Sequence, residues 1–364
     1  MFERDKPYNE LPPLPPNQDL ETKKTLKAAI AANKALAQLK TRGNLLPNQS
    51  MLIDSLVLLE AKDSSEIEDI FTTNDKLYQA DAIGGKAFDP HTKEVRRYRE
   101  ALWHVVNSVH NKPLGVNTFI DIYRIIKENQ SGVRKTSGTK IASPFGDVVY
   151  TPPDGYERLL KLLGNLEQFM HNQDDIDPLI KMAVLHYQFE AIHPFSDGNG
   201  RTGRILNILY LLQEHLLDVP ILFLSSYIIR NKVAYYKGLQ NVTEQQAWEE
   251  WIIYMLKAVE VTSYETIARI DAIRLAMKSY KAKMQKELPS NVYGKELLEI
   301  IFEQPYCTTQ SLVDRGIAQR QTAAIYLKQI SDIELLIPQK IGRYKVYINP
   351  TLMDILNKSP EALL

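Results

Sequence analysis

Residues 193–204 read His-Pro-Phe-Ser-Asp-Gly-Asn-Gly-Arg-Thr-Gly-Arg, and this segment decides the fold of the chain. It lies between two apolar runs with helical spacing, Pro178–Glu190 and Arg201–Leu217. The glycines at its centre let backbone N–H groups approach a ligand closely, and the start of the second helix adds unpaired donors and the positive end of a helix dipole. The segment therefore predicts an anion-binding loop between two helices.

Three side chains of this segment suit a polyphosphate and its metal ion, and a fourth suits proton transfer. Arg201 and Arg204 are three positions apart on the second helix, so they share a face and can clamp successive phosphates. Asp197 offers a hard oxygen ligand for a Mg²⁺ ion carried on those phosphates. His193 can accept a proton from an incoming hydroxyl near neutral pH. The plainer alternatives, a core histidine and a solvated arginine face, do not account for the glycine-rich loop between them.

Helical spacing continues on both sides of this loop. Helices are expected at about residues 19–43, 47–59, 93–110, 117–129, 157–171, 178–190, 201–217 and 244–284, and the polar segment at 61–70 is expected to begin a new helical turn. The exception is Thr139–Pro153, where β-branched and aromatic residues flank a Pro-Phe-Gly-Asp sequence, the composition of a hairpin. The expected fold is therefore mainly α with one β-hairpin.

The last part of the chain follows a different pattern. Helical spacing at 294–302, 309–314 and 319–333 precedes two β-like runs joined through Gly342, an order that resembles a winged helix. Basic residues here suit phosphate contacts, but acidic neighbours dilute their charge, so protein docking is favoured over DNA binding. The basic residues are Arg315, Arg320, Lys328, Lys340, Arg343 and Lys345, the aromatic ones Tyr326 and Tyr344, and the acidic ones Asp314, Asp332 and Glu334.

Composition limits the remaining classes of function. The 364 residues carry 44 lysines and arginines against 44 aspartates and glutamates, so the whole chain projects no strong field toward nucleic acid or anionic membranes. No apolar stretch reaches the length of a membrane span, and the first residues lack the apolar centre of a secretory signal. The single cysteine, Cys307, fits a reducing compartment. We therefore expect a cytoplasmic protein with no membrane partner.

Position by position, residues 193–204 resemble the signature of the Fic/Doc family, His-x-Phe-x-(Asp/Glu)-Gly-Asn-Gly-Arg-x-x-Arg, and all eight specified positions agree. The resemblance extends over about residues 5–260, including YNELPPLPP, SSEIEDIFTT, Gly132-Val-Arg134 and the predicted hairpin. It implies a mainly α, Fic-type helical core with a β-hairpin flap, followed here by the winged-helix-like domain.

The resemblance also implies an activity, the transfer of AMP from ATP with Mg²⁺ to a serine, threonine or tyrosine hydroxyl of a target protein or of the enzyme itself. His193 is then the general base, Asp197 holds the metal, and Phe195 anchors the loop in the core. The hairpin aligns an extended target segment by strand addition. The implied nucleotide-binding residues are Gly198, Asn199, Gly200, Arg201, Thr202, Gly203 and Arg204 at the phosphates, with Tyr235, Tyr236 and Asn231 at the adenine.

A second motif of the family is an inhibitory (Ser/Thr)-x-x-x-Glu-(Gly/Asn) segment, which the residues from Ser64 to Asp69 resemble. Glu68 is then expected to pair with Arg204 and to remove the cation that orients the γ-phosphate, so that the enzyme inhibits itself. The sequence departs from the motif at Asp69. An alternative stays open, because Ser65-x-x-Glu68 also fits a capping box at a helix start.

Three domains are predicted: residues 1–90 with an inhibitory helix at about 63–72, a Fic core at 91–285, and a winged-helix-like domain at 286–364. A homodimer is expected because relatives frequently dimerise. Two other functions stay open, a Fic transferase that moves phosphate, UMP or phosphocholine, and a nucleotide-sensing DNA-binding regulator. Glycine at position 200, where phosphorylating relatives carry lysine, favours nucleotidyl transfer. Tyr235 and Tyr236 also fit ordinary aromatic packing between helices.

Overall fold

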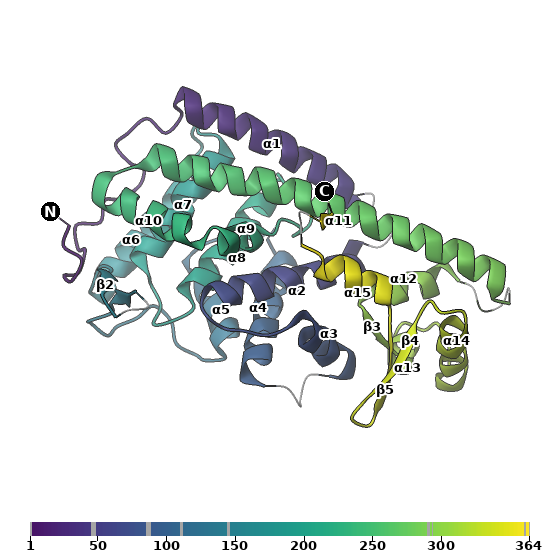
Figure 1. The fold of residues 1–364 in the computed structure, drawn as a ribbon. Helices are drawn as coiled ribbons and strands as arrows, with labels where there is room; N and C mark the ends of the chain where they lie inside the picture. Colours follow the sequence, from purple (N-terminus) through teal and green to yellow (C-terminus); the bar gives the residue numbers. More distant parts are fainter. Residues whose placement is uncertain are drawn as a thin grey trace. The chain divides into compact units, whose positions relative to one another are not determined.

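The computed structural model of the chain describes residues 2–44, 49–84, 89–109, 112–143, 146–289, 292, 294–359 and 362–363. Over these residues the fold is mainly helical, with one two-stranded and one three-stranded antiparallel sheet (Figure 1). This confirms the predicted fold class. None of the helices in this part of the chain combines the length and the apolar character of a bilayer span.

The chain folds into two compact units, each built from two segments. The first unit contains residues 1–37 and 97–262, and the second contains residues 38–96 and 263–364. The predicted domain boundaries near 90 and 285 follow sequence patterns and not contacts, and they stay a prediction. Three helices contribute residues to both units, α1 (Lys23–Asn44), α4 (Pro90–Val106) and α11 (Trp248–Glu287).

The first unit is built around the two helices that flank the glycine-rich loop. α7 (Pro178–Ile192) is buried on nearly every side, and α8 (Asn199–Gln213) packs against it. Their close approach depends on Gly203, where a Cβ would lie 2.6 Å from Glu190 Oε1 and 3.1 Å from Phe189 Cδ1. The elements around this pair are α5 (Val116–Lys127), β1 (Ile141–Ala142), β2 (Val148–Tyr150), α6 (Tyr156–His171), α9 (Leu224–Arg230) and α10 (Lys232–Gln245).

The predicted hairpin is present as β1 and β2, which pair antiparallel. Pro144 and Phe145, at the predicted turn, lie outside the described residues. The Tyr150 hydroxyl donates a hydrogen bond to the Ala191 carbonyl at 2.8 Å, so the second strand is tied to the end of α7. The hairpin is therefore held directly beside the start of the glycine-rich loop.

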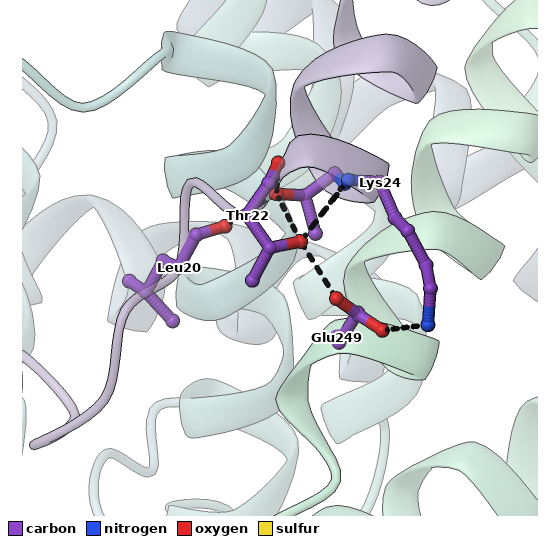
Figure 2. A network of polar contacts seen from close by, with 5 residues as sticks. Leu20, Thr22, Lys24 and Glu249 are labelled. Carbon is purple, nitrogen blue, oxygen red and sulfur yellow. Dashed lines mark hydrogen bonds and ion pairs between the residues drawn. The ribbon is translucent and has the colours of Figure 1, made fainter.

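Thr22 fixes the start of α1 to the start of α11 within the first unit. Its Oγ1 accepts a hydrogen bond from the Lys24 N–H at 3.2 Å and donates one to Glu249 Oε2 at 2.6 Å (Figure 2). The Lys24 ammonium donates to the other carboxylate oxygen, also at 2.6 Å. A hydroxyl that satisfies the first N–H groups of a helix stops the helix from extending backwards. α1 therefore begins at Lys23, although its spacing predicts a start near residue 19.

The second unit combines α2 (Gln49–Ile67) and α3 (Asn74–Ile83) with the carboxyl-terminal part of the chain. The structure confirms the winged-helix order and adds one strand, β3, that the sequence pattern did not predict. β5 lies between β3 and β4, and Gly342 connects β4 to β5 with φ +56°. The elements are α12 (Lys295–Glu303), β3 (Tyr306–Thr308), α13 (Thr309–Asp314), α14 (Arg320–Asp332), β4 (Ile337–Ile341), β5 (Tyr344–Ile348) and α15 (Pro350–Asn357).

The two segments of the second unit share one core. α2 packs on α12, and Ser55 Oγ donates a hydrogen bond to the Glu303 carbonyl at 2.6 Å. α3 packs on β3, where the Tyr306 hydroxyl donates to Asp75 Oδ1 at 2.5 Å. The predicted start of the second helix, near Pro47, lies outside the described residues.

The polar segment at 61–70 does not begin a new helical turn, because α2 continues without a break through Ser64 to Ile67. The helix ends where Asp69 adopts φ +60°, and the Glu68 N–H donates to the Ser65 carbonyl at 3.0 Å. Only residues 63–67 of the predicted inhibitory helix are therefore helical. The capping-box interpretation is wrong, since Ser65 lies at the carboxyl end of a helix and not at its start.

Candidate active site

The glycine-rich loop begins at His193, directly after α7. His193 caps that helix with a left-handed backbone, φ +48°, and its N–H donates to the Phe189 carbonyl at 3.1 Å. A left-handed residue turns the chain sharply away from the helix axis. His193 stays partly exposed while Ile192 and Pro194 on either side are buried. The Nδ1 atom of its ring is buried, so the exposed part of His193 does not include that nitrogen.

Asn199 holds the loop closed with its side chain. Its Oδ1 accepts a hydrogen bond from the Phe195 N–H and its Nδ2 donates to the Phe195 carbonyl, both at 2.8 Å. Phe195 is fully buried and stacks on Tyr123 of α5 with ring centroids 4.3 Å apart. The Asn199 side-chain amide is thus occupied by the backbone of the loop. Phe195 lies where the resemblance places an anchor.

The amino end of α8 directly follows the loop. Gly198 precedes the helix with φ +73°, a conformation that glycine adopts without strain. The Gly198 N–H donates to Asp197 Oδ1 at 2.6 Å, and the Thr202 hydroxyl donates to the Gly198 carbonyl at 2.9 Å. Gly200 lies in the same turn, so the backbone of residues 199–201 supplies the helix-end donors for an anion.

The two arginines of α8 are buried and point to different neighbours. Arg201 is 0% exposed, and its Nη2 lies 3.9 Å from Asp197 Oδ1. Arg204 is 2% exposed, and its charge acts on His186 of α7 and Tyr235 of α10. Burying a guanidinium group costs free energy unless negative charge or hydrogen-bond acceptors surround it. Arg201 therefore lies close to the loop residue Asp197, and Arg204 lies near His186 and Tyr235.

Asp197 faces a cation that the sequence did not indicate. Lys127, the last residue of α5, places its Nζ 2.6 Å from Asp197 Oδ2. Burial opposes ionisation of Asp197, but the hydrogen bond from Lys127 and the charge of Arg201 hold the pKa of its carboxyl below the usual value. The contact joins positions far apart in the sequence, so no local pattern signals it.

A magnesium ion fits this site as part of a nucleotide complex. Among the described residues, no group of three or more histidine, cysteine, aspartate or glutamate side chains gathers to hold a metal. Asp197 offers one carboxylate, and its side chain is 60% exposed. Because Mg²⁺ commonly takes its remaining ligands from phosphates and water, one aspartate suffices for an ion bound through a nucleotide.

Arg134 ties the loop to the hairpin. Its Nε donates to the His193 carbonyl and its backbone N–H donates to the Pro194 carbonyl, both at 2.9 Å. On the other side, its Nη2 donates to the carbonyl of Pro153, just after β2. One buried side chain therefore couples the position of His193 to that of the hairpin.

His186 of α7 forms a buried network with residues of α8 and α10 that no local sequence pattern indicates. Its Nε2 lies 2.8 Å from the Tyr235 hydroxyl oxygen, and its Nδ1 lies 3.1 Å from Asn207 Nδ2. Burial, and to a smaller degree the charge of Arg204, lowers the pKa of His186 to about 3. The imidazole is therefore neutral at pH 7. Because an amide nitrogen can only donate, Nδ1 accepts from Asn207 and Nε2 donates to Tyr235.

The residues predicted at the adenine differ in their surroundings. Tyr235 is 2% exposed, and its ring packs against Tyr236 and Trp251, so it is part of the core. Tyr236 is 46% exposed. Asn231 lies between α9 and α10, where its Nδ2 donates to the Tyr227 carbonyl at 2.9 Å. Tyr236 is therefore the member of this set best able to meet a base, and the adenine assignment stays a prediction.

Ser64 and Glu68, the predicted inhibitory residues, belong to the second unit at the end of α2. Ser64 is buried and Glu68 is partly exposed. Asp69, which follows, has φ +60°, in the left-handed region that glycine and asparagine favour and aspartate tolerates. Asp69 stands at the position where the family motif carries Gly or Asn, and its backbone conformation is one that those two residues favour.

Comparison with known proteins matches three parts of the chain to families. The Fic/DOC family matches residues 113–211, and its amino-terminal domain matches residues 26–107. Residues 276–352 match the carboxyl-terminal domain of SoFic-like protein adenylyltransferases. The chain belongs to the Fic/DOC family. In this Fic protein the match at 113–211 includes the whole glycine-rich loop together with Lys127, Arg134 and the hairpin.

Curated relatives of this Fic protein carry adenylyltransferase names. A probable protein adenylyltransferase of Aquifex aeolicus is 35% identical over 95 residues, which are 26% of this chain and 27% of that protein. The protein adenylyltransferase Fic of Aedes aegypti is 31% identical over 130 residues, 34% of this chain and 25% of that protein. The chain thus spans about a quarter of the length of these curated relatives.

Solved structures share the fold. A Fic family protein from Desulfovibrio desulfuricans superimposes with a TM-score of 0.53 and 19% identity, covering 92% of this chain and 98% of that one. Fic-1 of C. elegans superimposes with a TM-score of 0.51 and 20% identity, covering 68% and 74%. At these identities the likeness concerns the fold alone.

Proposed function

We propose that this Fic protein is a protein adenylyltransferase, which transfers AMP from ATP to a hydroxyl group of a protein. One arrangement carries the proposal: the partly exposed His193, the ionised Asp197 and the buried Arg201 and Arg204 all belong to one loop and the helix start that follows it. The names of the Aquifex and Aedes relatives support the same reaction.

In this reaction His193 takes the proton from the target hydroxyl, whose oxygen attacks the α-phosphorus of ATP. The new O–P bond forms while the bond to the β-phosphate oxygen breaks, and pyrophosphate leaves. The amino end of α8, with Arg201 and Arg204, stabilises the charge that develops on the phosphate oxygens. Asp197 would hold Mg²⁺, which neutralises phosphate charge when bound.

We propose further that the target segment adds to the hairpin as an extra strand. β1 and β2 pair only with each other among the described residues, and strand addition uses the main-chain hydrogen-bonding groups at the edge of such a sheet. Tyr150 and Arg134 fix that hairpin against the end of α7 and the His193 carbonyl. A docked strand would then present a serine, threonine or tyrosine hydroxyl beside the imidazole.

Inhibition by Glu68 belongs to the same proposal. Pairing of its carboxylate with Arg204 would withdraw the guanidinium group from the γ-phosphate. The match of Ser64 to Glu68 with the family motif and the left-handed Asp69 support this role. Glu68→Gly is expected to increase label transfer to the protein itself, and an unchanged rate in this variant would exclude the inhibitory assignment.

Labelled ATP tests the reaction. The protein, alone and in a cell lysate, is incubated with ATP labelled at either the α- or the γ-phosphate, with UTP and CDP-choline as competing donors. Label from the α-position should appear on protein, whereas γ-label alone would identify phosphate transfer. His193→Ala should lower transfer by roughly 10²–10⁴-fold while ATP still binds. Undiminished transfer in that variant would rule out the general base.

A second candidate function, a nucleotide-sensing regulator that binds DNA, is favoured by the charge of the wing. Residues 335–348 contain three basic residues, Lys340, Arg343 and Lys345, and no acidic one, and the three line a hollow of about 300 Å³. Mobility-shift measurements at two salt concentrations test it, since phosphate contacts give a steep salt dependence. A mobility shift that is lost in Arg343→Glu would support DNA binding. The absence of a shift with the wild type would exclude DNA binding and favour a protein partner for the wing.

We also propose a cytoplasmic homodimer. Leu26 and Ile30, one turn apart on α1, are 40% and 70% exposed, and adjacent exposed apolar side chains are typical of an interface. Light scattering should report a dimer for the wild type and a monomer for Ile30→Asp. A wild-type monomer at micromolar concentration would exclude the proposal.

A further inference from the structure

Lys127 lies over the amino end of α8, in the middle of the proposed phosphate site. Its Cδ and Cγ are 3.4 and 3.7 Å from the position that a Cβ on Gly198 would take. Its Nζ is 2.6 Å from Asp197 Oδ2, and the lysine side chain is 21% exposed. The lysine therefore covers the glycine with its stem and holds the aspartate with its charge.

The surrounding charges favour this arrangement. Asp197 Oδ1 accepts from the Gly198 N–H and faces Arg201 at 3.9 Å, so Oδ2 is the oxygen that Lys127 occupies. Glu128, the neighbour of Lys127, pairs with Arg97 at 2.9 Å. Lys127 and Arg201 thus both approach the Asp197 carboxylate, and cations of this kind suit a polyphosphate.

We infer that Lys127 is a positioning residue that competes with free divalent cations for Asp197, so that the metal enters the site together with the nucleotide. The inference rests on the proposed function, which supplies the nucleotide and its metal. A cation that binds Asp197 alone must displace an ammonium group at hydrogen-bond distance. When a nucleotide arrives, its phosphates offer the ammonium a second partner, and Asp197 Oδ2 becomes available to the ion.

Titration of the full-length protein with Mn²⁺ alone tests this competition, because free Mn²⁺ is measured directly by electron paramagnetic resonance. Lys127→Met keeps an unbranched stem and removes the charge. We expect this variant to bind Mn²⁺ up to about fivefold more tightly than the wild type, which is the upper end of what a partly exposed ion pair contributes. Lys127→Arg, which keeps the charge, should bind as weakly as the wild type.

Two controls assign the effect to Asp197. Lys161→Met removes an exposed lysine of α6 and should leave Mn²⁺ binding unchanged. Lys127→Met combined with Asp197→Asn should lose the added affinity. The inference is overturned if Lys127→Met, with wild-type circular dichroism, binds Mn²⁺ no more tightly, or if the gain survives in the double variant.

ATP binding separates this inference from the proposed function. In the presence of Mg²⁺, Lys127→Met should bind ATP several-fold more weakly, because a phosphate loses one cation. The Mn²⁺ titration contains neither ATP nor target, so it reports on Lys127 even if no label is transferred. Loss of label transfer in the wild type would contradict the reaction and leave the competition at Asp197 standing.

Discussion

Asn199 shows how much of the loop depends on one side chain. Its amide makes two buried hydrogen bonds to the backbone of Phe195. Asn199→Ala leaves a buried N–H and a buried carbonyl unsatisfied, so it should lower the free energy of unfolding by roughly 2–4 kcal/mol. Urea denaturation measures the change, with the exposed Lys161→Ala of α6 as a control that should stay near wild type. A wild-type value for Asn199→Ala would show that water replaces both bonds.

His186 predicts a pH dependence of stability. Its pKa is about 3 in the folded protein, below the value of about 6.5 in an unfolded chain. The unfolded state therefore binds more protons between these values, and stability falls as pH decreases from about 6.5 toward 3. At pH 5 this group alone should cost about 2 kcal/mol relative to pH 7. Urea denaturation of His186→Gln at both pH values should show a smaller loss, and an equal loss would exclude His186 as the cause.

At the residue scale, the sequence predicts the site where the signal is local. His193, Asp197 and the two arginines stand in one short segment, so spacing alone suggests their roles. Lys127 and His186 act through contacts with residues distant in sequence, and their own surroundings in the chain are an ordinary helix end and an apolar helix. Such contacts follow from packing, which a single sequence does not reveal.

At the element scale, the hairpin is expected to depend on Arg134. The guanidinium group joins the carbonyls of His193 and Pro153. Arg134→Met should speed hydrogen exchange in β1 and β2 and lower label transfer at least tenfold, because His193 loses its fixed position. Tyr150→Phe removes one hydrogen bond to α7 and should have a smaller effect. If hydrogen exchange in β1 and β2 is unchanged in Arg134→Met, Arg134 does not anchor the hairpin.

The predicted helices match the observed ones best where the helical spacing of apolar residues is regular over a long segment. The structure places α5 to α8 within a few residues of the predicted ranges. β3 was missed because Tyr306–Thr308 is too short to show an alternating pattern. The end of α2 differs from the prediction because the left-handed backbone of Asp69 ends the helix. An aspartate in the sequence does not by itself indicate this conformation.

At the scale of the whole molecule, the sequence pattern and the contacts divide the chain differently. A change of composition near 285 suggests an independent last domain, but residues 38–96 belong to the same compact unit as residues 263–364. The cause is packing between helices that are distant in sequence. α2 buries apolar residues against α12, and the sequence of neither helix indicates which helix it packs against. α2, which contains Ser64 and ends just before Glu68, therefore shares a core with the winged-helix part.

This shared core predicts that damage to α12 weakens the inhibition proposed for Glu68. Ile301 of α12 is fully buried, so Ile301→Asp should loosen the packing that holds α2 and raise transfer of α-label to the protein itself. Glu296→Gln, at an exposed position of α12, is the matched control. Adding Glu68→Gly to Ile301→Asp should give no further increase, because both changes relieve the same restraint. If the two increases multiply, or if Ile301→Asp labels itself no faster while still binding ATP, the winged-helix part does not support the inhibitory segment.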